Sequence, residues 1–146
     1  MLLRNLNVNI TMIELKKKFS RSFGEFKQIC KDKELVVYEV TKAYKNGQKS
    51  TWYEVFKYRI SKSNKFVNDD HESYPSSVDF GTWAWCCSNP SCVAKVIEEH
   101  FPNHPTTKLL QQFIDGTYFS GGVERNHFSI GEKDLYNILI SWGVGS

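Results

Sequence analysis

The sequence has no run of apolar residues near the roughly 18 that a membrane-spanning helix needs. Its first ten residues are interrupted by Arg4, Asn5 and Asn7, so no signal peptide is predicted. It also lacks the Gly-rich phosphate loop, the Gly-x-Ser-x-Gly turn and the His-Glu-x-x-His motif of common enzyme classes. These absences predict a cytoplasmic protein without a membrane partner, and they favour a non-enzymatic function with no catalytic residue and no cofactor.

Cysteine is also scarce, with four residues at positions 30, 86, 87 and 92. In a reducing compartment these are expected to be thiols rather than disulfides. The composition is 40% hydrophobic, 24% charged and 14% aromatic, which is typical of a globular chain. The length of 146 residues suits one domain with a real core, so residues 1–146 are predicted to form a single domain.

Charge is distributed unevenly along the chain. Residues 1–66 hold 15 basic and 6 acidic side chains, whereas residues 67–146 hold 4 basic and 10 acidic ones. A polarised chain of this kind can associate with itself or present a basic face to an anionic partner.

The strongest local pattern is a β-hairpin over residues 35–60, centred on Asn46-Gly47, the pair preferred in type I′ turns. A two-residue loop predicts that Val40 lies opposite Tyr53 and that Glu39 lies opposite Glu54. Directly opposed carboxylates are unfavourable. Three explanations remain open: a nearby cation neutralises them, the register differs by one residue, or they form a paired-carboxylate site that binds a cation or shares a proton.

Residues 1–33 are interpreted as a basic helical segment, and residues 34–146 as the hairpin, a third strand and further helices. Thr11 is placed as an N-cap before a helix over residues 12–19. A second helix is predicted over residues 22–32, because Phe23, Phe26, Ile29 and Cys30 form an apolar stripe at helical spacing.

Beyond the hairpin, alternation around Trp83-Ala-Trp85 predicts a short third strand with both indoles on one face. Asn89-Pro90 opens the clearest helix, which runs to Phe101. Further helices are predicted over residues 107–115 and 132–142. The predicted fold class is therefore α+β: a small antiparallel sheet built on a central hairpin, with helices packed on it.

The cysteines and histidines offer two candidate chemical sites, a zinc site and a nucleophilic thiol. Cys87, Cys92, His100 and His104 have the residue types of a zinc site, but Cys92 and His100 would lie about 12 Å apart along one helix. No metal is therefore predicted, and Cys87, Cys92 and His104 are kept as candidate ligands. Cys87 also precedes a helix N-terminus, where the helix dipole lowers a thiol pKa and favours a nucleophile.

The favoured function is binding of a protein partner or self-association through the hairpin and its aromatic residues. The alternative is nucleic-acid binding by the basic first half. The surface residues proposed for either role are Lys16, Lys17, Lys18, Arg21, Trp52, Lys57 and Arg59.

The segments Trp52-Tyr-Glu-Val-Phe-Lys and Tyr74-Pro-Ser-x3-Phe80-Gly-x-Trp83-Ala-Trp85 carry a family resemblance. Over residues 50–101 the chain resembles small uncharacterised proteins of bacteriophages and mobile elements of Bacteroides-type gut bacteria. The resemblance implies a phage-related accessory protein that acts in the host cytoplasm, in host takeover, interference with host defence or nucleic-acid handling.

Overall fold

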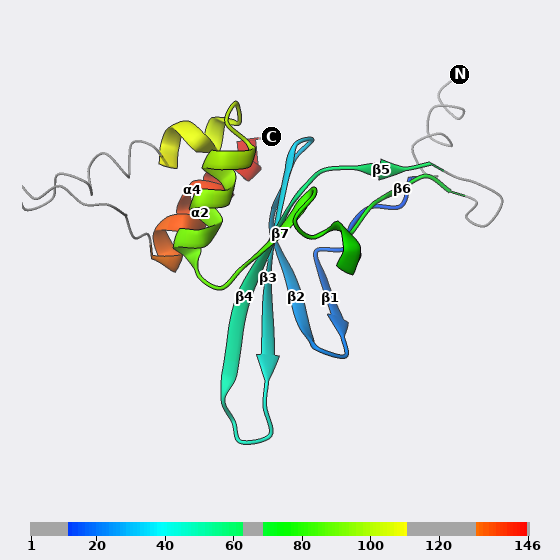
Figure 1. The fold of residues 1–146 in the computed structure, drawn as a ribbon, viewed down its shortest axis with the longest axis vertical. Helices are drawn as coiled ribbons and strands as arrows, with labels where there is room; N and C mark the ends of the chain where they lie inside the picture. The colour runs from blue at the N-terminus through cyan, green and yellow to red at the C-terminus, as the bar shows by residue number, and fades with distance from the viewer. Residues whose placement is uncertain (1–11, 63–68, 111–130, 146) are drawn as a thin grey trace, which may run out of the picture.

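The computed structural model describes residues 12–62, 69–110 and 131–145. A five-stranded sheet in the order β1-β2-β3-β4-β7 forms its centre, and every neighbouring pair is antiparallel (Figure 1). Its strands are β1 (Lys18–Arg21), β2 (Gly24–Lys31), β3 (Leu35–Ala43), β4 (Lys49–Lys57) and β7 (Ala84–Cys87). Further elements are β5 (Ile60–Ser61), β6 (His71–Glu72), the 3-10 turn η1 (Ser77–Asp79), and helices α2 (Pro90–His100) and α4 (Glu132–Gly145). The predicted α+β class is confirmed.

The central hairpin β3–β4 is present, but its register differs by one residue from the predicted one. Val40 lies opposite Trp52, and Glu39 lies opposite Tyr53 rather than Glu54. The loop has three residues, Lys45-Asn46-Gly47, closed by a hydrogen bond from the Tyr44 N–H to the Gln48 carbonyl at 2.8 Å. Within this loop Gly47 has a positive φ, of 87°, and Lys45 and Asn46 do not. This is a turn with a single left-handed glycine, and its extra residue shifts the pairing.

The shifted register sorts the hairpin side chains onto two buried faces. The helix face carries Leu35, Val37, Tyr53 and Val55, which pack with Cys87 and with apolar residues of α2 and α4. The aromatic face carries Val36, Tyr38, Val40 and Phe56, which pack with Phe26, Trp83 and Ala84. Because the side-chain period of a strand is two, the one-residue shift moves every β4 side chain to the face opposite the predicted one.

The predicted N-terminal helices are wrong. Residues 14–17 have no regular structure, and residues 18–21 and 24–31 form the strands β1 and β2. The register between β2 and β3 shifts between Gln28 and Cys30, which marks a β-bulge. The bulge lets both Ile29 and Cys30 pack on the helix face, whereas Phe26 packs on the aromatic face. Apolar residues on both faces of β2 therefore mimic a helical stripe in the sequence.

The third strand and the helix after it are confirmed. β7 pairs with β4, and the Asn89 side chain accepts a hydrogen bond from the Cys92 N–H at 2.9 Å at the start of α2. However, Trp83 precedes the strand and packs on the aromatic face, whereas Trp85 packs on the helix face and stacks on His100 at 4.0 Å. The prediction that the two indoles share one face is therefore wrong.

The last two predicted helices are partly described. Residues 105–110 are helical, and the remainder of the predicted 107–115 helix lies outside the described residues. α4 begins at Glu132 as predicted and ends at Gly145, beyond the predicted end at residue 142. No helix in the described ranges is long and apolar enough to cross a membrane.

Candidate interaction surface

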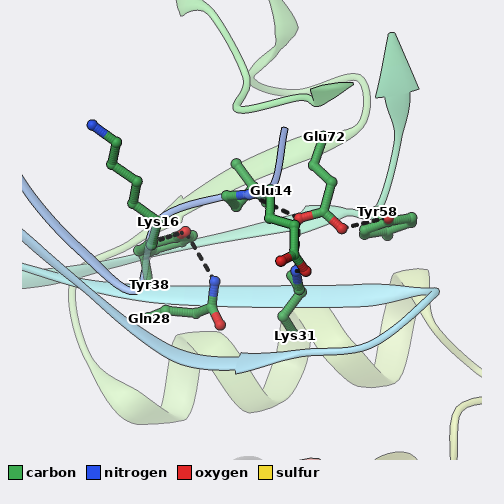
Figure 2. Close-up of polar contacts among 8 residues, drawn as sticks. Glu14, Lys16, Gln28, Lys31, Tyr38, Tyr58 and Glu72 are labelled. Carbon is green, nitrogen blue, oxygen red and sulfur yellow. Dashed lines mark hydrogen bonds and ion pairs between the residues drawn. The ribbon is translucent and has the colours of Figure 1, made fainter. Parts of the chain in front are cut away.

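Glu72 is the centre of a buried polar cluster that ties four segments together (Figure 2). Its side chain is 6% exposed and accepts hydrogen bonds from Lys31 Nζ at 2.6 Å, the Tyr58 hydroxyl at 2.5 Å and the Leu15 N–H at 2.8 Å. Next to it, the Tyr38 hydroxyl donates to the Lys16 carbonyl at 2.6 Å. These contacts hold the extended residues before β1 against β2, β3, β6 and the residue that follows β4.

The electrostatics of this cluster describe an ion pair rather than a catalytic acid. Burial acts to raise the pKa of Glu72, but the hydrogen bonds from Lys31, Tyr58 and Leu15 outweigh it and lower the pKa below its usual range. Burial and then the Glu72 carboxylate raise the pKa of Tyr58 to about 12. Glu72 is thus ionised at neutral pH with both oxygens engaged, which suits a structural role.

A second buried cluster joins the β2–β3 turn to the segment after α2. His104 is 1% exposed, and its Nε2 lies 2.5 Å from a carboxylate oxygen of Asp32. Its Nδ1 contacts the hydroxyl of Thr106, which is fully buried. An Asp–His–hydroxyl series also occurs in hydrolases. Here the hydroxyl and the imidazole are sealed from solvent, so the series locks two segments together.

The candidate metal ligands are divided between two places. Cys87 is fully buried and forms a side-chain hydrogen bond with Cys92, whereas His104 is engaged with Asp32 and Thr106. Across the described ranges, no three His, Cys, Asp or Glu side chains are grouped to hold a metal. Burial, followed by the hydrogen bond with Cys92, raises the pKa of Cys87. The predicted lowering of this pKa is therefore wrong.

The paired-carboxylate site is also not formed. Glu39 lies on the helix face, where it accepts a hydrogen bond from the Tyr136 hydroxyl, and Glu54 lies on the aromatic face, where it accepts one from Tyr74. Burial and then Glu132 raise the pKa of Glu39, while Lys27 opposes them. Of the three explanations, the register shift is the one that the structure supports.

The basic residues chosen from the sequence do not form one surface. Lys16 and Lys17 lie before β1, and Lys18 and Arg21 lie in it. Lys57 and Arg59 lie at and just beyond the far end of β4, where the Arg59 guanidinium covers the Trp83 ring at 4.8 Å. Arg21 is at the opposite end of the sheet, next to the β1–β2 turn. Trp52 is half-buried on the aromatic face, opposite Val40.

The structure instead reveals a basic surface on the tip of the central hairpin, here called the arm and defined as residues 41–51. The arm extends beyond the rest of the molecule at the lower edge of Figure 1. It carries Lys42, Lys45 and Lys49 and no acidic residue. Lys45 and Lys49 are exposed, Tyr44 is 44% exposed, and Lys42 Nζ lies 5.2 Å from the centre of the Tyr44 ring.

The other open part of the sheet is electrically balanced. On the helix face, a groove of about 440 Å³ crosses β1, β2 and β3. It is lined by Lys18 and Lys27 but also by Glu25 and Glu39. The arm is therefore the better candidate for contact with an anion.

Comparison of the chain with protein families, curated proteins and solved structures gives no match. The sequence-based candidates do not include the lysines of the arm. Three lysines and no acidic residue between Thr41 and Thr51 could have indicated a basic surface. What the sequence did not show is that this segment projects from the domain.

Proposed function

We propose that the protein is a non-enzymatic binding protein that contacts nucleic acid through the arm. The carrying observation is a projecting two-stranded ribbon with three lysines and no acid. Lysines placed near phosphates release condensed counterions from nucleic acid, which is a large favourable contribution to binding. A projecting ribbon can reach a phosphate backbone without interference from the acidic second half of the chain.

The inner aromatic residues do not contribute to this surface. Tyr38, Tyr53 and Phe56 are buried in the two clusters, so they cannot stack on bases. The ionisable clusters around Glu72 and His104 have partners within the protein and serve its stability. This division leaves contact to the exposed residues of the arm and of the neighbouring β1–β2 turn.

A protein partner, which the sequence favoured, is the second candidate. It is supported by the outer edge of β1, beside which the described residues place no further strand. A partner strand could add to this edge by backbone hydrogen bonds. Lysines on an edge strand discourage such pairing, and β1 begins with Lys18, so this candidate ranks behind nucleic acid. A phage-related accessory role is compatible with either partner and stays a prediction.

The test compares two triple variants with the same loss of charge. One replaces Lys42, Lys45 and Lys49 with Gln, and the control replaces Lys95, Lys108 and Lys133, which are exposed on the helical side. Binding of labelled single- and double-stranded DNA is measured by fluorescence anisotropy at several salt concentrations. We expect the arm variant to lower the salt slope by about 2 to 3, at about 0.7–0.9 per phosphate contact, while the control leaves it near the wild-type value.

Two outcomes would overturn the proposal. If wild-type protein binds neither DNA nor RNA, the function is wrong. If the arm and control variants lose affinity equally, binding depends on net charge and not on the arm. Native mass spectrometry of the untagged protein then distinguishes a homo-oligomer from a monomer. A homo-oligomer would support self-association, and a monomer would contradict it.

A further inference from the structure

A single row of residues crosses four strands at the base of the arm and includes two arm residues, Lys42 and Ser50. Arg21 of β1 lies opposite Gly24 of β2, and Lys42 of β3 lies opposite Ser50 of β4. Because Glu25 pairs with Thr41, Gly24 is placed beside Lys42, and the row is continuous. Cross-strand neighbours point to the same face, which here is the aromatic face.

In this row Arg21 and Lys42 lie on opposite sides of Gly24, which has no side chain. Neighbouring strands lie about 4.8 Å apart, so the backbones of Arg21 and Lys42 are about 10 Å apart across Gly24. A Cβ on Gly24 would lie 3.0 Å from Val40 Cγ1 and 3.1 Å from the Thr41 carbonyl oxygen, so this close approach of β2 to β3 favours glycine. No side chain of β2 therefore stands between Arg21 and Lys42 in this row.

The cations are held by aromatic rings. The Arg21 guanidinium lies 4.8 Å from the ring centre of Tyr74 and 5.2 Å from that of Phe19, yet Arg21 remains exposed to solvent. A guanidinium stacked in this way is oriented, and its N–H groups at the edge of the plane stay available to an oxyanion.

Two exposed aromatic rings accompany the row. Phe23, in the β1–β2 turn, is 42% exposed and contacts the Phe26 ring edge-on at 5.5 Å. Tyr44, at the base of the hairpin loop, is 44% exposed, and its hydroxyl accepts a hydrogen bond from Ser50 Oγ at 3.3 Å. The sheet face therefore alternates cations with rings that retain open surface.

The acidic residue on this face near the row, Glu54, does not block an anion from reaching Arg21 and Lys42. Glu54 lies two rows behind Lys42, is 8% exposed, and has its oxygens engaged by Tyr74 and by Trp52 Nε1 at 3.4 Å. Through its hydrogen bond from Tyr74 it orients one of the rings that support Arg21.

We propose that this row binds single-stranded nucleic acid, with phosphates on Arg21 and Lys42 and unstacked bases on Tyr44 and Phe23. The inference rests on the proposed function and specifies its ligand. Interleaved cations and exposed aromatic rings suit a single strand, because its bases are free to stack, whereas duplex DNA offers mainly phosphates. The sequence-tolerant stacking predicts little preference among bases.

The experiment compares Tyr44→Ala with Ile140→Ala, a variant at a residue of equal exposure on α4. Labelled oligo-dT and a duplex of the same length serve as probes in fluorescence anisotropy. We expect Tyr44→Ala to weaken oligo-dT binding about 5- to 150-fold, which corresponds to about 1–3 kcal/mol for one stacked base. Duplex binding should change less than twofold, Tyr44→Phe should bind oligo-dT like wild type, and Ile140→Ala should have no effect.

The outcomes separate this inference from the proposed function. If the arm lysine variant weakens binding of both probes while Tyr44→Ala and Phe23→Ala weaken neither, the arm binds nucleic acid by charge alone and the single-strand site is wrong. If Tyr44→Ala weakens both probes equally, specificity for single strands is likewise refuted. If the lysine variant has no effect either, the proposed function fails as well.

Discussion

Replacement of Glu72 by alanine tests whether the buried cluster holds the N-terminal segment onto the sheet. The change leaves Lys31, whose side chain is 20% exposed, without its 2.6 Å partner and removes the acceptor of Tyr58 and of the Leu15 N–H. Removing one member of a buried ion pair costs about 3–5 kcal/mol. Because Lys31 can partly reach water, we expect a loss of about 3 kcal/mol, at the low end of that range.

The assay is urea unfolding at pH 7, followed by tryptophan fluorescence and interpreted at a constant m-value. The control is Lys62→Ala, which removes an exposed partner of Asp70 at 3.5 Å and should cost less than about 1 kcal/mol. Equal midpoints for the two variants would refute the assigned role of Glu72.

The pH dependence gives an independent check. Because the pKa of Glu72 is lowered on folding, its stabilisation is present above the unfolded value of about 4.3 and is lost as the pH falls through the folded pKa. The stability difference between wild type and Glu72→Ala should therefore narrow in acid. A difference that stays constant down to pH 2 would contradict the ion-pair explanation.

Three further predictions concern single residues. Gly24→Ala should lower the thermal midpoint, since its new methyl would lie 3.0 Å from Val40 Cγ1; an unchanged midpoint would show that the strands can separate without cost. Glu39→Gln should stabilise the protein at pH 7 and not below pH 4. The pKa of Glu39 is raised on folding, so its ionisation at higher pH costs stability that glutamine does not cost, and urea titrations at both pH values test this. His104→Ala should cost about 2–4 kcal/mol by loss of a buried, hydrogen-bonded side chain, whereas a change under 1 kcal/mol in urea unfolding would contradict its locking role.

The N-terminal segment shows where local pattern reading fails. Phe23, Phe26 and Ile29 recur at helical spacing, but Phe26 and Ile29 lie on opposite faces of a sheet that is covered on both, so a strand produces the same spacing. Helix propensity is a weak preference, and it is overridden when Phe19 and Phe26 can stack at 4.6 Å on the aromatic face. Only the presence of a neighbouring strand distinguishes the two structures.

The hairpin shows a finer limit. Asn46-Gly47 located the turn correctly, yet the same pair fits both a two-residue and a three-residue loop, and the choice decides the face of every β4 side chain. The three-residue loop is the one formed, and it places Tyr53 and Val55 against the helices and Phe56 against the aromatic cluster. Which loop forms depends on the apolar area buried on both faces of the sheet, and that area is a property of the whole domain.

By itself the sequence determined the α+β class, the hairpin, the third strand, the start of α2 and the polarity of charge, because these depend on short-range periodicity, turn residues and caps. The tertiary structure alone decided which charges share a surface. It separated Lys57 and Arg59 from Arg21, paired Glu72 with Lys31 over 41 residues of sequence, and aligned Arg21 with Lys42 across Gly24. Such neighbours are set by strand register and order, which no local pattern in the chain encodes.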